Sequence, residues 1–328
     1  MAEGSLNHPH LFSPSKANRP SVSWDWPRLL GRVFLGLALL TLGLMALGSA
    51  TRVMNAGLAC PDWPLCYGAV VPRQQMNLQV FLEWFHRLVA SSLGALVLVL
   101  TGTVWGLRQR LPRWLPWATT SSLGLVVFQG VLGGLTVTEL LRFDIVTAHL
   151  ATGLLFFCSL LAIAASLWPY QGTGVVGKLH WVGLGAATLV YLQNILGALV
   201  ASQWAVHQCR QGMGLCQVMY SHLAGVVPAT LSVGILIWMA WRVAALHPLL
   251  RRCAQGAGGL LILQALLGTL TLRLQLQVPT LTVAHQMVGA TLLGTLVVFS
   301  VIAARDRRQA QYILAIPQTT VPEESVNV

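Results

Sequence analysis

Long apolar runs alternate with short polar segments along almost the whole chain. Each of eight runs is long enough to cross about 30 Å of hydrocarbon as an α-helix. The pattern predicts an all-α integral membrane protein with eight transmembrane helices, at residues 29–50, 81–107, 117–138, 145–167, 179–201, 218–241, 253–274 and 280–304. The polar segments 1–28 and 306–328 are expected to be disordered tails, and the first lacks the apolar core of a cleavable signal.

A histidine recurs near the start of every second apolar run. The later two follow the earlier two by 136 residues, and the spacing within each pair is 63, for His86, His149, His222 and His285. This regularity predicts an internal repeat with two histidines per copy. We expect two tandem four-helix bundles, residues 29–170 and 171–305, related by an axis along the membrane normal.

Composition and charge support this interpretation and add an orientation. With 55% hydrophobic and 9% charged residues, the chain is too apolar for a soluble protein. The net charge of +11 is dispersed over short loops, so nucleic acid is not an expected partner. If the helices alternate across the bilayer, fourteen Lys and Arg residues fall on one side and five on the other. The positive-inside bias then places both termini in the cytoplasm and the four histidines toward the outer face.

Two pairs of cysteines occupy corresponding outer loops, namely Cys60 with Cys66 and Cys209 with Cys216. Close pairs in an exported loop favour disulfides, although free thiols remain the alternative because short loops can be too strained to bridge. Recurrence of the pair in the second loop favours the disulfide. Cys158 and Cys253 lie in or beside apolar runs and are interpreted as packing residues.

The recurring histidines are candidate axial ligands of haem iron. One histidine at a membrane helix end is usually interfacial or hydrogen-bonded, but four at a fixed repeat favour one bis-histidine haem in each bundle. A zinc or copper site would require further ligands, which the second copy lacks. The remaining histidines are assigned structural or solvated roles: His8, His10, His180, His207 and His247.

The two copies differ beside the first histidine. Glu83 and Arg87 flank His86, whereas the corresponding positions of the second copy are Met219 and Leu223. Charged groups inside a membrane are costly unless they function. We therefore expect the first copy to perform chemistry and the second to hold a redox cofactor, with a Glu83–Arg87 pair or a helix cap as the structural alternative.

A motif Gln-x-x-Leu-Gly recurs in three runs, at 129–133, 193–197 and 264–268. It suits helix packing, because glycine permits close approach and glutamine can bond across helices. The alternative is that the glycines clear room for a flat macrocycle. Both functions are compatible with the sequence.

The segments GLACPDWPLCYG, EWFHR, SHLAG and AHQMVGA, together with the matched halves, resemble the haem A synthase family over residues 29–304. The resemblance implies oxidation of a methyl group of haem O, through hydroxylation, to the formyl group of haem A for cytochrome oxidase. It implies that His86 and His149 hold the substrate haem, that His222 and His285 hold a haem b cofactor, and that Glu83 is the essential carboxylate.

The same resemblance makes Cys60 and Cys66 the functional outer pair, with five intervening residues where the second loop has six. Other functions remain open at this stage. A di-haem b-type electron-transfer protein would use the same histidines, and a haem transporter or chaperone would bind haem without turnover. The electron partner, quinone or protein, an association with haem O synthase and the source of the oxygen atom are left open.

Overall fold

The computed structural model describes residues 25–201 and 215–315, and this part of the chain folds into eight long helices. They are α1 (Trp26–Val53), α2 (Leu78–Gly106), α3 (Leu115–Thr138), α4 (Phe143–Leu167), α5 (Leu179–Val200), α7 (Leu215–Arg242), α8 (Pro248–Arg273) and α9 (Pro279–Ala315). All eight contain a window long and apolar enough to span a membrane. The prediction of an all-α, eight-span integral membrane protein is confirmed.

Each predicted span overlaps one observed helix, and the differences lie at the ends. Capping residues explain several of them: Asp25 accepts a hydrogen bond from the Arg28 N–H at 3.3 Å, and Asn77 accepts one from the Val80 N–H at 3.0 Å. These polar residues precede the apolar runs, so hydropathy alone places the helix starts too late. Proline begins α8 and α9, where its missing N–H costs nothing.

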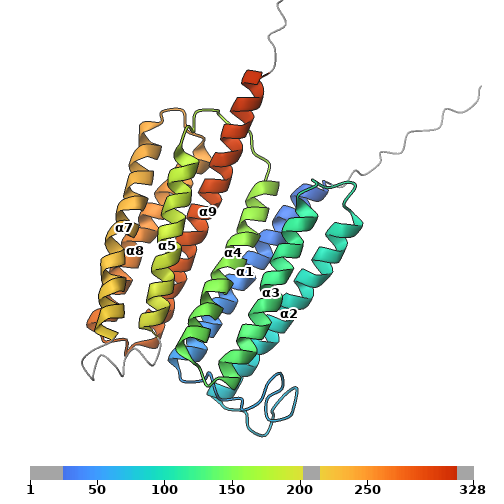
Figure 1. The fold of residues 1–328 in the computed structure, drawn as a ribbon, viewed down its shortest axis with the longest axis vertical. Helices are drawn as coiled ribbons and strands as arrows, with labels where there is room; N and C mark the ends of the chain where they lie inside the picture. Colours follow the sequence, from blue (N-terminus) through green and yellow to red (C-terminus); the bar gives the residue numbers. More distant parts are fainter. Residues whose placement is uncertain (1–24, 202–214, 316–328) are drawn as a thin grey trace, which may run out of the picture.

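The helices form two groups of four (Figure 1). In the first, α1 packs against α2 and α4, and α3 packs against α2 and α4. In the second, α5 and α8 each pack against both α7 and α9. The groups meet where α9 contacts α1 and α4, and where α4 contacts α5. Each group is therefore a closed four-helix bundle with its own apolar core.

Helices α4 and α9 occupy the centre of the molecule. In each, 56% of the most apolar window is buried, against 28% or less in the other six. Those six expose large apolar side chains, such as Val99 and Leu266, on surfaces suited to lipid. Six exposed tryptophans lie near the helix ends that face away from loop 54–77, at positions typical of a membrane interface: Trp114, Trp117, Trp168, Trp181, Trp238 and Trp241.

The expectation of a disordered tail from residue 306 is wrong for residues 306–315, because α9 continues to Ala315. Asp306 is fully buried. Its carboxylate accepts hydrogen bonds from the Tyr170 hydroxyl at 2.6 Å, the Thr173 N–H at 2.9 Å and the Gly174 N–H at 2.8 Å. These donors belong to the segment that joins the bundles. The polar sequence from residue 306 suggested a solvated tail. Instead, the Asp306 carboxylate satisfies backbone donors of the segment that joins the bundles.

Candidate functional site

A large cavity lies in the first bundle, near the end of the molecule that carries loop 54–77. Its volume is about 1070 Å³, at the top of the roughly 300–1,000 Å³ range of ligand pockets. Side chains of α1, α2, α3 and α4 line it, together with Trp63 of the loop and Gln286 of α9. The cavity can therefore hold a large organic ligand, and both bundles contribute to its wall.

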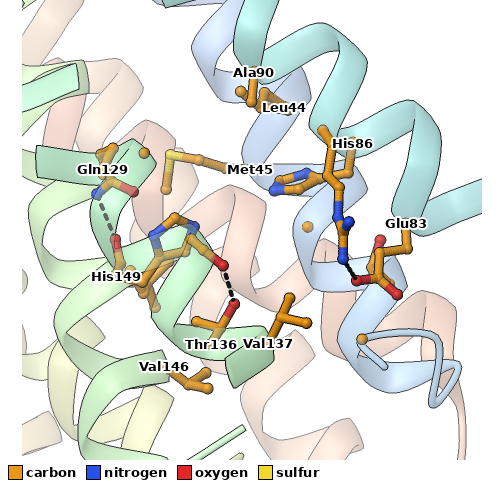
Figure 2. Close-up of a pocket in the computed structure, with 18 of the residues that line it drawn as sticks. Leu44, Met45, Glu83, His86, Ala90, Gln129, Thr136, Val137, Val146 and His149 are labelled. Carbon is orange, nitrogen blue, oxygen red and sulfur yellow. Dashed lines mark hydrogen bonds and ion pairs between the residues drawn. The ribbon is translucent and has the colours of Figure 1, made fainter. Parts of the chain in front are cut away.

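Two of the predicted histidines meet at this cavity. His86 on α2 and His149 on α4 both line it, and Figure 2 shows their rings directed toward a common space from opposite sides. Each ring presents Cε1 to a glycine of a neighbouring helix. A Cβ added at Gly48 would lie 2.9 Å from Cε1 of His86, and one added at Gly133 would lie 3.5 Å from Cε1 of His149. Two imidazoles facing one cavity form a suitable pair of axial ligands.

The other two histidines form a second pair, on α7 and α9. His222 and His285 lie close enough to interact electrostatically. Their rings pack against glycines in the same manner, with an added Cβ at Gly197 lying 3.1 Å from Cε1 of His222 and one at Gly268 lying 2.8 Å from Cε1 of His285. The structure therefore brings the four histidines together in two pairs. In each pair, one histidine lies on a central helix, α4 or α9.

The recurring Gln-x-x-Leu-Gly motif has a packing role that involves these histidines. Gln129 Nε2 donates to the His149 carbonyl at 2.6 Å, and Gln193 Nε2 donates to the His222 carbonyl at 2.7 Å. The glycine one turn further along the same helix receives the imidazole ring. Glutamine and glycine thus fix the backbone and the ring of one histidine, and the space beside the glycine is filled by the imidazole.

Glu83 is buried beside His86 and contacts both loop 54–77 and Arg87. Its side chain is paired with Arg87 at 2.5 Å, so the pairing considered as a structural alternative is present. Its other oxygen accepts the Cys60 N–H at 2.8 Å. Arg87 also donates to the Asp62 and Leu65 carbonyls, each at 2.6 Å. Because Glu83 and Arg87 both line the cavity, the ion pair is available to a bound ligand and also supports the loop.

Cys60 and Cys66 form the predicted disulfide, with their Cα atoms 4.8 Å apart. Asp62 stabilises the turn that this bond closes, because it accepts the Gly68 N–H at 2.8 Å and the Tyr67 N–H at 2.6 Å. The Gly68 bond, followed by the Tyr67 bond and the charge of Arg87, holds the pKa of Asp62 below its usual range. The turn is therefore anchored by a covalent bond and by a carboxylate.

The loop also reaches the cavity. Trp63 lines it and packs on α3, where a Cβ added at Gly134 would lie 3.2 Å from the indole ring.

As predicted, Cys158 and Cys253 are free cysteines. The side chains of Cys209 and Cys216 lie outside the described residues, so their disulfide stays a prediction.

Sequence reasoning missed three groups at this site. Gly48 receives the His86 ring, but it is not part of a Gln-x-x-Leu-Gly motif, because Leu44 stands where the motif has glutamine. Arg52 and Gln286 are not among the site residues that the sequence predicts. A signal was available for Arg52, since it follows Gly48 by four residues and therefore shares its helix face.

Comparison with known proteins supports the resemblance noted above. The family model described as cytochrome oxidase assembly protein, COX15-CtaA, matches residues 31–297. A heme A synthase of Shewanella oneidensis is 28% identical over 308 residues, which cover 78% of this chain and 91% of the relative. The heme A synthase of Caulobacter vibrioides is 26% identical, with 88% and 97% covered, and that of Bacillus licheniformis is 24% identical, with 86% and 100% covered.

Proposed function

Because this chain belongs to the COX15-CtaA family of cytochrome oxidase assembly proteins, we propose that it is a haem A synthase. The reaction converts a methyl group of haem O to the formyl group of haem A, through a hydroxymethyl stage. This change removes four electrons and four protons when water supplies the oxygen atom. The observation that carries the proposal is the cavity of about 1070 Å³ in which two histidines face each other beside a buried carboxylate.

The substrate haem would bind in the first bundle. His86 and His149 reach the cavity from opposite sides, so their imidazoles would hold the substrate iron. Trp63 and its loop cover part of the cavity and would limit the access of water to the reacting methyl group. The surrounding wall is mostly aliphatic, which suits a porphyrin with a long apolar side chain.

Glu83 would be the catalytic carboxylate. It is 4% exposed and lies three residues before His86 on the same helix face. In this position it would accept a proton released from the methyl group or stabilise positive charge that develops there. Arg87 would keep Glu83 directed at the cavity through the ion pair, since Arg87 is itself fixed by the loop carbonyls.

A haem b cofactor would be held by His222 and His285 in the second bundle. The fit is supported by the two neighbouring imidazoles, each of which packs against a glycine. Gln193 Nε2 contacts Nδ1 of His222 at 3.1 Å and would orient this ligand. Such a haem transfers electrons one at a time.

The proposed orientation places both termini in the cytoplasm and the cysteine loops on the outer side, in a bacterial cell membrane or an equivalent energy-transducing membrane. The start of α1 and the end of α9 lie at one end of the molecule and loop 54–77 lies at the other, which supports opposite sides of the membrane for the termini and this loop (Figure 1). The electrons would pass to a quinone or a protein, and the substrate would come from a haem O synthase.

The test is mass spectrometry of porphyrins extracted from cells that make haem O but lack haem A synthase activity. We expect a formyl porphyrin only when this chain is expressed, and none with the His86→Ala variant. A bound haem b with no change in the cellular porphyrins would indicate an electron-transfer protein. Bound and exchangeable haem O without oxidation would indicate a transporter or chaperone. Either result would overturn the proposed activity.

A further inference from the structure

Arg52 places a guanidinium in the wall of the cavity. It lies in the last turn of α1, and its Nε atom is buried without a hydrogen-bond partner among the described residues. Its Nη2 atom donates to Oε1 of Gln286 at 3.4 Å, across the boundary between the bundles. An amide oxygen at this distance leaves most of the donors and the charge of Arg52 uncompensated. Charge at such a place is costly unless a ligand pairs with it.

The other arginines that line the cavity are already paired. Arg87 binds Glu83, and Arg142 binds Asp144 at 2.7 Å and Glu139 at 3.4 Å. Within the described ranges, Arg52 is thus the cavity-lining arginine without a carboxylate partner. The unpaired charge of Arg52 predicts that a bound ligand supplies the missing anion.

We propose that Arg52 and Gln286 form a carboxylate-binding subsite that holds a propionate of the substrate haem. The proposal rests on the function proposed above and adds the group that orients the porphyrin. A guanidinium can pair with a carboxylate through two parallel hydrogen bonds, which fixes direction as well as position. Because this interaction would fix one edge of the porphyrin, it would determine which methyl group lies beside Glu83.

The position of Arg52 agrees with this role. It follows Gly48 by four residues, so it lies about 6 Å further along α1 than the glycine that receives the His86 ring. The residues four after the corresponding glycines Gly133, Gly197 and Gly268 are uncharged: Val137, Ala201 and Leu272. The subsite is therefore a property of the first cavity. Gln286 follows His285 directly, so a carboxylate bound here would contact both bundles.

The test compares haem O with its dimethyl ester, which has the same ring but no carboxylates. The full-length protein, purified with its C-terminal haem, is titrated with each compound by absorption spectroscopy. We expect the parent to bind haem O about ten- to a hundredfold more tightly than the ester, as for a charge-assisted hydrogen bond. Arg52→Gln should lose this preference by weakening only the binding of haem O. The effects of the Arg52→Gln substitution and of esterification should not add, because each removes the same interaction.

Two further variants separate binding from folding. Gln286→Glu keeps Arg52 but supplies a competing carboxylate, so it should also weaken haem O relative to the ester. Arg273→Gln removes an exposed arginine from the last turn of α8 and should behave as the parent. Equal affinities of the parent for haem O and its ester, or an unchanged preference in Arg52→Gln, would overturn the subsite. No binding of either compound by the parent would overturn the proposed function itself.

Discussion

At the scale of single residues, Glu83 combines two structural contacts with its proposed chemical role. It binds the backbone of Cys60 and the side chain of Arg87, while its carboxylate remains at the cavity wall. The sequence indicated its importance through the contrast with Met219, but not the contact to the loop. That contact spans 23 residues and depends on how the disulfide turn folds back, which spacing along a helix does not describe.

Glu83→Gln should separate these contributions. Glutamine keeps an oxygen for the Cys60 N–H but cannot ionise, so we expect haem A formation to fall by about a hundredfold or more. Haem O or its hydroxymethyl form should accumulate in the purified variant, with the haem b spectrum unchanged. Porphyrin analysis provides the measurement. Glu139→Gln, an exposed change at the same end, is the control. Parental production of haem A would restrict Glu83 to a structural role.

Asp62 gives the cysteine loop a dependence on pH. Its pKa is lowered in the folded protein by the Gly68 and Tyr67 N–H groups and by Arg87. Its stabilisation of the turn is therefore fully present above the ordinary aspartate pKa of about 3.9 and is lost as the pH falls through the lower folded value. Amide exchange of the loop peptide should accelerate in that acidic range. Asp62→Asn should abolish the acid-dependent step, and a persistent step would assign it to another group.

At the scale of helices, the hydropathy pattern located all eight elements because each must present an apolar surface to lipid or to a neighbour. The pattern could not locate caps such as Asp25, nor the extension of α9, since polar residues there are satisfied by tertiary contacts. The histidine spacing predicted the two pairs. It did not predict that glycines accommodate the imidazole rings, because a close approach between helices depends on their crossing geometry.

Gly268→Ala tests the fit between these elements. The new methyl group would lie 2.8 Å from Cε1 of His285, so the ring or the helix must move. We expect the purified protein to retain about tenfold less haem b, measured by its absorption spectrum. Gly259→Ala on the same helix meets nothing within 4 Å and should retain haem b as the parent does. Equal retention in both variants would show that the close approach does not control the ligand.

At the scale of the whole molecule, α9 connects the bundles at both ends. Near the cavity it supplies Gln286, and at the opposite end Asp306 and Arg305 hold the connecting segment. Arg305 donates to the Ala165 carbonyl at 2.6 Å and the Trp168 carbonyl at 2.8 Å, which caps the end of α4. The repeat pattern predicted two units, but contacts that occur only once in the molecule have no periodic signal.

Asp306→Ala should loosen this connection. It would leave the donors of Tyr170, Thr173 and Gly174 without their acceptor, in a region where buried polar groups are costly. We expect the apparent Tm of the purified protein to fall by about 5 °C or more. Arg308→Ala, an exposed change two residues later, should leave the Tm unchanged. A Tm equal to that of the parent would show that the connection adds little to stability.

The contact between Gly174 and Asp306 also has a consequence for the order of events during synthesis. The two residues are separated by 132 positions. At about 5–20 residues per second, a ribosome takes roughly 7 to 26 seconds to add that length of chain. During this interval the backbone donors of the connecting segment have no carboxylate to bind, although the first bundle has already been made. The final relation of the two halves can therefore be fixed only after translation has passed residue 306.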